Sequence, residues 1–467
     1  MRLAEFLRLR HGMRSDRSGG VCRRAIAGSR AATACVLVAS VVCAQGVAQT
    51  APTATDIKPQ ELSRDATRIY ERAKSSLFQV RVLTASGRSQ ATTGSGFVVG
   101  SGGLAITNYH VVAKLVLDPN RYVAEAVTAS GERDDVTVLK IDVLHDLALI
   151  RIAKRRDWPP LKISSRALRQ GERLYSLGNP LDLGFAISEG AFNGQITRPY
   201  YPQILFSGAI NSGMSGGPSV DESGEVVGVN VSKRLDGEQI SFLVPAQFVA
   251  ALLQRGTAIA AQPSQQEFRS EIGQQLTTHQ SMMADQLLKA PLATRAMGPY
   301  AAPINEMQGI RCWGDDPSMP QLKYHYSRLH CQNESVVGVE DALRTGFINV
   351  RHEYYATEQL DSFRFLQIYG KSYKNETFGS HRDRHRTGPE CTDAFVKGDS
   401  QNSVPVRAVV CVRALRKFEG LYDFALMAAT VDDSHSGLHT RMDASGVTLE
   451  NGQRITKAFL DAIGRRP

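Results

Sequence analysis

The chain has 467 residues, of which 42% are hydrophobic and 22% charged, and its formal charge is +9. These values resemble those of soluble globular proteins, so they exclude a wholly disordered chain, a collagen and a polytopic membrane protein. Eight arginines and two acidic residues lie within residues 1–48, so the remainder carries only about +3. We therefore expect no nucleic-acid partner, because the bulk of the chain lacks a strong positive field.

The first 48 residues have the three parts of an export signal. A basic region runs from Arg2 to Arg30, an apolar run from Ala31 to Ala44, and small residues at 46–48 mark a cleavage site before Gln49. The apolar run is about half of the ~20 residues that cross a bilayer, which makes an uncleaved anchor the weaker alternative. We expect a signal peptide at 1–48, an N-terminal extension at 49–74, and an exported protein, periplasmic or secreted, without a stable membrane span after cleavage.

Short strand-like segments separated by Gly, Asn and Asp fill the next part of the chain, and we place this domain at residues 75–255. Its clearest runs are Phe78–Leu83, Gly94–Val99, Val136–Val143 and Leu147–Ile152. Many short strands with frequent turns predict a β-barrel or a β-sandwich.

A helix is predicted within the following linker, residues 256–302. Ser264 and Glu267 form a capping-box pattern ahead of apolar residues that recur about every four positions. The apolar residues are Phe268, Ile272, Leu276, Met283 and Leu287. This spacing indicates one apolar stripe on the helix.

Residues 303–467 predict a separate α+β domain. Its strand-like runs are Leu322–Leu329, Phe363–Ile368 and Val404–Val412, and a helical pattern that includes Ile455 and Phe459 ends the chain. A basic run at 381–386 is flanked by glycines and is expected to form a solvated loop rather than an anion or metal site.

Four cysteines, an even number, lie in this C-terminal region. In an oxidising compartment they predict two disulfides, and of the three possible pairings we expect Cys312–Cys331 and Cys391–Cys411. Buried free thiols are the alternative. A zinc site is disfavoured because no two cysteines have a short Cys-x-x-Cys spacing, and we expect no metal.

Three segments carry the residue types of nucleophilic catalysis. His110 follows an apolar strand, Asp146 directly precedes a buried-looking strand, and Ser215 lies among small residues in Gly213–Pro218. Each has an ordinary alternative: a packed histidine, a turn residue or a plain loop. Together they give His, Asp and Ser in the chain order of chymotrypsin-type enzymes, separated by 36 and 69 residues.

Four motifs resemble the HtrA/Deg branch of the trypsin-like serine proteases. They are GSGFVVGSGGLAITNYHVV at 94–112, DLALIRI at 146–152, LYSLGNPLDLG at 174–184 and SGAINSGMSGGPSV at 207–220. The resemblance covers about residues 75–250 and implies two antiparallel six-stranded β-barrels with the site between them. The expected fold class is therefore mainly β, with two chymotrypsin-like barrels followed by the linker helix and the α+β domain.

The sequence departs from this family in two places. Met214 stands where the family usually has Asn or Asp. The C-terminal half also has no recognisable PDZ domain, since it lacks a Gly-Leu-Gly-Phe-like loop.

The resemblance implies a role for each catalytic residue. Ser215 would be the nucleophile, His110 its base and Asp146 the partner of the base, while the backbone N–H groups of Gly213 and Ser215 would form the oxyanion hole. The expected function is an exported serine endopeptidase that acts on protein or peptide substrates without a cofactor. The alternative is a binding or regulatory protein that keeps the protease fold and uses its C-terminal domain for recognition.

The resemblance also places Ala209 at the base of the pocket for the P1 residue, whose carbonyl is attacked. Ile210, Ile240 and Phe242 would add apolar walls. We expect small or medium aliphatic P1 residues. Because all catalytic groups precede residue 220, we also expect the C-terminal domain to be dispensable for the chemistry. The sequence leaves the oligomeric state open.

Overall fold

The structure, a computed structural model, describes residues 63–466 apart from 155–157, 197–199, 234–239, 307–308, 318, 320, 335 and 374–382. The expected signal peptide and most of the N-terminal extension lie outside the described residues. The described residues belong to a single unit defined by their mutual contacts. Within these ranges, no helix is both long enough and apolar enough to span a membrane.

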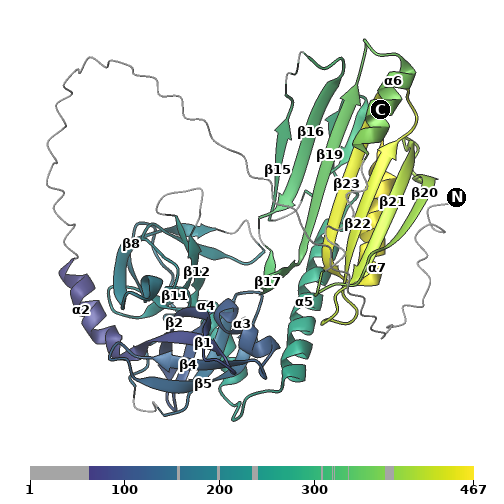
Figure 1. Cartoon of the computed structure of the whole chain (residues 1–467). Helices are drawn as coiled ribbons and strands as arrows, with labels where there is room; N and C mark the ends of the chain where they lie inside the picture. The colour runs from purple at the N-terminus through teal and green to yellow at the C-terminus, as the bar shows by residue number, and fades with distance from the viewer. Residues whose placement is uncertain are drawn as a thin grey trace, which may run out of the picture. The chain divides into compact units, whose positions relative to one another are not determined.

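Two closed antiparallel barrels of six strands each make up the first part of the chain (Figure 1). The strand order is β1-β2-β3-β6-β5-β4 in barrel 1 and β10-β11-β12-β9-β8-β7 in barrel 2, which confirms the predicted fold class. The elements are α2 (Arg64–Ala73), η1 (Lys74–Ser76), β1 (Leu77–Thr84), β2 (Gln90–Gly100), β3 (Leu104–Thr107), α3 (Tyr109–Leu117), β4 (Tyr122–Val127), β5 (Arg133–Asp142), β6 (Leu147–Ile152), β7 (Arg173–Gly178), η2 (Pro180–Asp182), β8 (Ala186–Ile196), β9 (Gln203–Phe206), β10 (Pro218–Val220), β11 (Val226–Lys233), β12 (Ser241–Pro245) and α4 (Ala246–Gly256).

Buried apolar side chains join the two barrels. Strands that are covered on both faces become continuous apolar runs, as in β6, where Leu147 to Ile150 are all fully buried. One cluster combines Phe97 and Ile106 of barrel 1 with Tyr175 and Val229 of barrel 2. Loops at the junction of the barrels are thereby held at fixed positions.

The predicted linker helix is α5 (Gln265–Leu287), and its capping box is present. The Ser264 hydroxyl accepts the N–H of Glu267, and the Glu267 carboxylate accepts the N–H of Ser264. The apolar stripe contributes Phe268, Ile272 and Leu276 to the core of barrel 1. The helix is therefore an integral part of the barrel's packing and not a free spacer.

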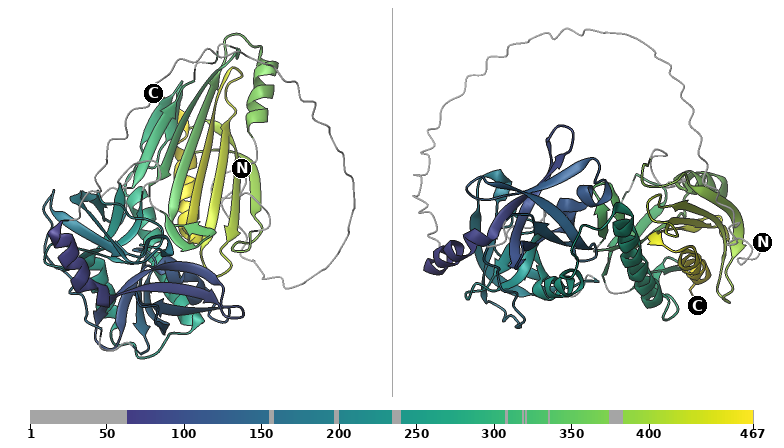
Figure 2. Two further views of the ribbon diagram at one scale, coloured as in Figure 1. Left: turned by 60° about the vertical axis from the view of Figure 1, so that its left-hand side comes forward. Right: turned by 90° about the horizontal axis from the view of Figure 1, so that it is seen from below.

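The C-terminal part is built on a seven-stranded antiparallel sheet, in the order β15-β16-β19-β23-β22-β21-β20. Helix α7 packs against β22 and β23, and α5 also contacts β23 (Figure 2). The elements are β13 (Thr294–Met297), β14 (Tyr300–Pro303), β15 (Ile310–Asp315), β16 (His325–Asn333), β17 (Val337–Glu340), β18 (Leu343–Thr345), β19 (Phe347–Ala356), α6 (Ser362–Ser372), β20 (Glu390–Lys397), β21 (Pro405–Ala414), β22 (Tyr422–Thr430), β23 (Ser436–Val447), α7 (Leu449–Ala462) and β24 (Gly464–Arg465).

The strand predicted at Phe363–Ile368 is wrong, because this segment lies in helix α6. The Asp361 side chain accepts the N–H of Arg364 and starts the helix as an N-cap. Phe365 and Tyr369 are buried one helical turn apart, while Phe363 is 78% exposed. The short apolar run therefore belongs to a helix with one buried face.

Two disulfides link adjacent strands of the sheet. Cys312 pairs with Cys331 between β15 and β16, and Cys391 pairs with Cys411 between β20 and β21. In each pair the two residues lie directly opposite each other in the strand register. This is the pairing that the sequence predicts.

Candidate active site

His110 lies in the first turn of α3, directly after the end of β3. Tyr109 and Val111 on either side of it are fully buried, whereas the side chain of His110 is 45% exposed. The burial of its neighbours fixes the backbone of this turn. The imidazole is thus held by a rigid helix end while remaining accessible.

Asp146 is fixed to that helix end through both its backbone and its side chain. Its φ of 55° lies in the left-handed region, which is costly for most residues other than glycine. The carbonyl of Asp146 accepts hydrogen bonds from Asn108 Nδ2 at 2.8 Å and from the N–H of Tyr109 at 3.1 Å. These two bonds stabilise the strained backbone next to α3.

The carboxylate of Asp146 binds His110 twice. It accepts the backbone N–H of His110 at 2.8 Å, and it lies 2.6 Å from Nδ1 of the imidazole. A carboxylate only accepts hydrogen bonds, so Nδ1 carries the proton and Nε2 is left with its lone pair. Asp146 therefore sets the tautomer that a general base requires.

The charge surroundings of His110 favour the protonated ring. Burial lowers the pKa of His110, but the charge and hydrogen bond of Asp146 and the charge of Asp341 outweigh it and raise the pKa above 6.5. Asp341 belongs to the C-terminal part of the chain. A residue distant in sequence thus helps to raise the pKa of the imidazole.

The loop that carries Ser215 depends on glycines. Gly213 has a φ of 93°, and a Cβ there would lie 2.4 Å from the carbonyl oxygen of Asn179. Gly216 has a φ of 86°, and a Cβ there would lie 2.3 Å from the carbonyl oxygen of Ser95. Substitution at either position would displace the loop that carries Ser215.

Two backbone N–H groups of this loop are available to a ligand. Those of Met214 and Gly216 donate to backbone carbonyls, whereas those of Gly213 and Ser215 donate to no atom of the described residues. Two free donors flanking Met214 match the arrangement expected of an oxyanion hole. Met214 itself is only 2% exposed and packs in the core of barrel 2, so its departure from the family pattern leaves the donors intact.

The hydroxyl of Ser215 is bonded away from the histidine. Its Oγ donates to the carbonyl of Val231 at 3.0 Å. Within the described part of the chain, no hydrogen bond joins Ser215 to His110. Hydrogen bonds between catalytic groups are often absent without substrate, so this orientation does not argue against the predicted pairing of Ser215 with His110.

The expected P1-pocket residues occupy different environments. Ala209 is exposed, and Ile240 and Phe242 are half-buried. Ile210 is 2% exposed and packs with Met214 and Leu243 in the core of barrel 2. Ile210 therefore supports the barrel, and its role as a pocket wall remains a prediction.

Sequence reasoning missed Ser95 and Asn108, which hold the site together. Ser95 Oγ accepts the N–H of Asn179 at 2.9 Å and donates to the carbonyl of Gly213 at 2.7 Å. Its backbone N–H donates to the carbonyl of Ser215 at 2.7 Å. Ser95 lies within the 94–112 motif, but the partners that reveal its role are more than 80 residues away in the chain.

Metal ligands do not gather in the part of the chain that the structure describes. No group of three or more His, Cys, Asp or Glu side chains lies in a suitable arrangement there.

Comparison with known proteins agrees with this geometry. Residues 94–229 match the model of the trypsin-like peptidase domain. The chain is 36% identical over 175 residues to the mitochondrial serine protease HTRA2 of Bos taurus, covering 35% of this chain and 36% of that protein. It is 34% identical over 182 residues to the serine protease HTRA4 of Homo sapiens, covering 37% of each chain. The chain spans about a third of the length of these relatives, and the predicted resemblance to HtrA proteases is confirmed for its peptidase domain.

Proposed function

We propose that this chain, which contains a trypsin-like peptidase domain similar to that of the HtrA serine proteases, is an exported serine endopeptidase acting on protein substrates. The observation that carries the proposal is the 2.6 Å pair of His110 and Asp146 in a domain whose serine loop has two N–H groups without a partner among the described residues. Export is supported by the basic and apolar start of the chain and by two disulfides, which persist in oxidising compartments.

The residues supply each step of peptide hydrolysis. His110 Nε2 takes the proton of Ser215 as its Oγ attacks the substrate carbonyl, and Asp146 stabilises the imidazolium that forms. The carbonyl oxygen becomes an oxyanion, which the N–H groups of Gly213 and Ser215 bind. His110 then gives the proton to the leaving amine, and water hydrolyses the acyl-enzyme by the same base.

A fluorophosphonate probe tests the proposed nucleophile. We expect the wild type to be labelled, because an activated serine hydroxyl attacks the phosphorus, and Ser215→Ala to lose labelling completely. Ser101→Ala, in the exposed turn before β3, is the control and should be labelled like the wild type. A wild type that is folded but unlabelled would favour the binding-protein alternative.

Activity is expected to fall on acidification. His110 accepts a proton only when neutral, and its pKa is raised above 6.5 by Asp146 and Asp341 in spite of its burial. The value of kcat/KM should therefore rise with pH through a midpoint above 6.5. Asp341→Asn should lower this midpoint, since it removes one of the negative charges that raise the pKa of His110. A profile that is flat from pH 5 to 8 contradicts the role of His110.

The proposed P1 preference is for small or medium aliphatic side chains. None of the predicted wall residues, Ala209, Ile210, Ile240 and Phe242, carries a charge. An unpartnered charge costs several kcal/mol to bury, whereas one methylene changes binding by only about 1–3 kcal/mol. Profiling with a peptide library should show faster cleavage after Val, Ala or Ile than after Lys, Arg, Asp or Glu. A clear preference for Arg or Glu would refute this pocket assignment.

A further inference from the structure

A hairpin of the C-terminal domain, β17 and β18, is attached to the helix that carries His110. The hydroxyl of Tyr109 donates to the carbonyl of Val339 at 2.9 Å. Lys114 of α3 forms an ion pair with Asp341 at 3.1 Å. Both ends of α3 are therefore bonded to the hairpin, and Val339 is fully buried in the core that α3 shares with barrel 1.

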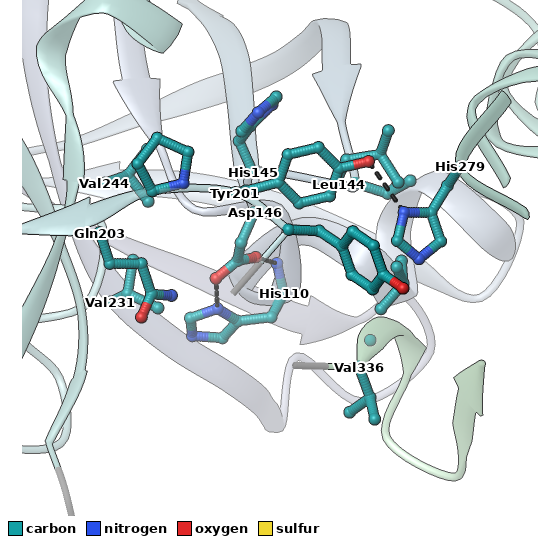
Figure 3. A pocket seen from close by; sticks show the side chains of 15 residues that line it. His110, Leu144, His145, Asp146, Tyr201, Gln203, Val231, Val244, His279 and Val336 are labelled. Atoms are coloured by element: carbon teal, nitrogen blue, oxygen red, sulfur yellow. Dashed lines mark hydrogen bonds and ion pairs between the residues drawn. The ribbon is translucent and has the colours of Figure 1, made fainter. Parts of the chain in front are cut away.

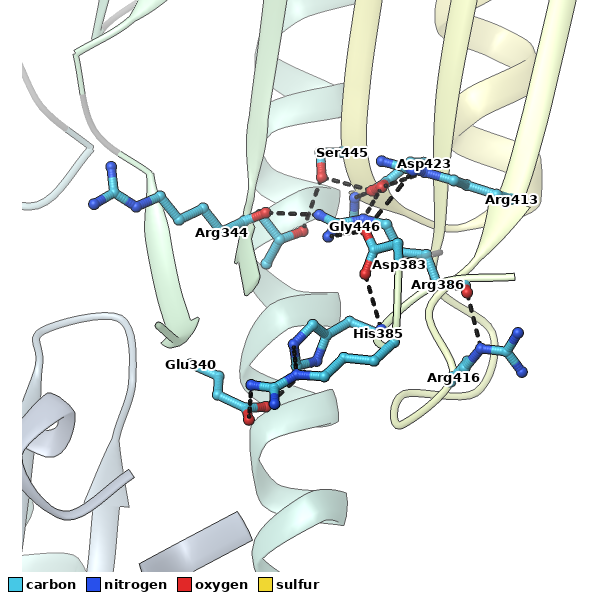
Figure 4. A network of polar contacts seen from close by, with 12 residues as sticks. Glu340, Arg344, Asp383, His385, Arg386, Arg413, Arg416, Asp423, Ser445 and Gly446 are labelled. Atoms are coloured by element: carbon cyan, nitrogen blue, oxygen red, sulfur yellow. Dashed lines mark hydrogen bonds and ion pairs between the residues drawn. The ribbon is translucent and has the colours of Figure 1, made fainter. Parts of the chain in front are cut away.

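A polar network holds the same hairpin to its own sheet (Figure 4). Glu340 forms ion pairs with Arg384 at 3.2 Å and Lys417 at 3.1 Å. Arg386 donates to the carbonyl of Arg344 at 3.1 Å. The side chain of Arg386 is only 9% exposed, so this part of the predicted solvated loop is in fact packed. The hairpin is thus a fixed element and not a mobile loop.

Alternation along the strand gives the hairpin two different faces. Val337 and Val339 point into the core, at 5% and 0% exposure. Val336 and Gly338 alternate with these valines and therefore lie on the other face, where Val336 is 41% exposed. A Cβ added at Gly338 would meet no atom within 4 Å. The second face therefore borders open space.

That space is a cavity of about 240 Å³ beside the catalytic histidine (Figure 3). Its hairpin wall consists of Val336, Gly338 and part of Val337, and its barrel walls include Val143 and Val231. Polar side chains also reach it, among them His110, Asp146, Tyr201 and Gln203. The lining thus combines both barrels with the C-terminal hairpin. A cavity of ~150 Å³ already holds a benzene molecule, so this one has room for a leucine or phenylalanine side chain.

His279 of α5 closes the inner end of this cavity in a neutral form. Its Nδ1 accepts the hydroxyl of Tyr201 at 2.9 Å, and its Nε2–H donates to the carbonyl of Gly346 at 3.1 Å. Burial lowers the pKa of His279 and outweighs the opposing effect of the bond to Gly346. Neither ring nitrogen of His279 is left to bind a polar ligand, and the valines of the lining, Val143, Val231, Val244, Val336 and Val337, give this cavity its apolar walls.

The path of a substrate points to the occupant of the cavity. After Val229, the backbone of Asn230 still bonds Gly216 and Gly217. Beyond Asn230, no strand of the described residues pairs with β11 on this side, so an extended peptide can lie along the edge that includes Val231. Side chains of an extended peptide alternate in direction. If the P1 side chain points toward Ala209, the next residue on the acyl side, P2, points the opposite way, toward His110 and the cavity.

We infer that the C-terminal hairpin completes a substrate pocket for an apolar P2 side chain, with Val336 and Gly338 as its outer wall. This inference rests on the proposed endopeptidase function. It makes the C-terminal domain a determinant of specificity at the second residue before the scissile bond.

The test compares full-length wild type, Gly338→Leu and Val336→Asp on peptides that differ only at P2. Wild type should cleave a P2 leucine peptide about tenfold faster, in kcat/KM, than a P2 alanine peptide. Gly338→Leu fills the cavity and should remove this preference while changing cleavage of the P2 alanine peptide less than about threefold. Val336→Asp should raise kcat/KM for a P2 lysine peptide by about tenfold relative to the P2 leucine peptide, because the new carboxylate in the pocket wall pairs with the lysine.

Controls separate this inference from the proposed function. Gly388→Leu places the same side chain in open space elsewhere in the C-terminal part, and Val431→Asp alters a valine of similar exposure. Both should keep the wild-type P2 preference. Gly388→Leu and Val431→Asp should react with the fluorophosphonate probe at the wild-type rate, and Gly338→Leu and Val336→Asp should still be labelled, since the probe has no P2 group. Normal labelling with an unchanged P2 preference in Gly338→Leu overturns the inference alone, whereas an unlabelled wild type overturns the endopeptidase proposal as well.

Discussion

Replacing Asp146 with asparagine is expected to lower kcat/KM for peptide hydrolysis by about four orders of magnitude. The Asp146 carboxylate accepts hydrogen bonds from both the backbone N–H and Nδ1 of His110. An asparagine that keeps the first bond presents its NH₂ group to the ring, so Nδ1 becomes the acceptor and Nε2 carries the proton. A protonated Nε2 cannot take the proton of Ser215. The measurement is steady-state hydrolysis of one peptide at pH 8.

The matched control is Asp393→Asn. Asp393 is an exposed carboxylate that pairs with Arg407 in the C-terminal sheet, and its loss should leave hydrolysis unchanged. Thermal unfolding should show that Asp146→Asn remains folded. An Asp146→Asn variant within tenfold of wild type would contradict the assigned role of this residue.

Phe268→Ala is expected to lower the free energy of unfolding by about 3–5 kcal/mol. Phe268 is 1% exposed and lies in a core that includes barrel 1, α5 and the C-terminal hairpin. Because this core is shared, the barrel and the C-terminal sheet should lose stability together. Met282→Ala on the same helix is the control, since Met282 is 40% exposed and should change stability by less than about 0.5 kcal/mol.

The two tryptophans of the chain allow each part to be followed separately. Trp158 packs against the barrel core and Trp313 lies on β15 of the C-terminal sheet. In Trp158→Phe the remaining Trp313 reports unfolding of the C-terminal sheet, and in Trp313→Phe the remaining Trp158 reports unfolding of the barrel. Urea unfolding of each variant is followed by tryptophan fluorescence, with and without Phe268→Ala. Equal midpoint shifts at both tryptophans are expected. A shift confined to one of them would show that the parts are independent.

The shared core also bears on the expectation that the C-terminal domain is dispensable. A chain that ended near residue 262 would lose Phe268, Ile272 and Leu276, and would leave apolar residues of barrel 1 in water. The position of the catalytic residues before residue 220 says nothing about this packing. We therefore expect catalysis to require the helix and the hairpin as structural support.

Local patterns in the sequence predict the elements whose signals are local. The capping box at Ser264 marks the start of α5, and alternating or apolar runs mark the barrel strands. The sequence predicts a strand in place of helix α6, because Phe363 and Phe365 are common in strands as well as in helices. The N-cap formed by Asp361 and the burial of Tyr369 one turn after Phe365 distinguish the helix from a strand.

The sequence likewise predicts the parts of the candidate site that lie in local motifs, but not its long-range contacts. The motifs bring out His110 and Asp146, which the structure places in contact. The orientation of the Ser215 hydroxyl depends on Val231, and the docking of the hairpin depends on Tyr109 and Val339, which are 230 residues apart. No pattern within a short window of sequence carries information about contacts of this range.

The cross-strand disulfides fasten both borders of the C-terminal sheet. The outermost strands, β15 and β20, are each joined covalently to the strand beside them. Outer strands are the parts of a sheet that fray most readily, and a frayed strand has the extended form in which a protease binds its substrates. By fastening both borders of the sheet, the disulfides keep these segments out of the extended form that the proposed endopeptidase would bind.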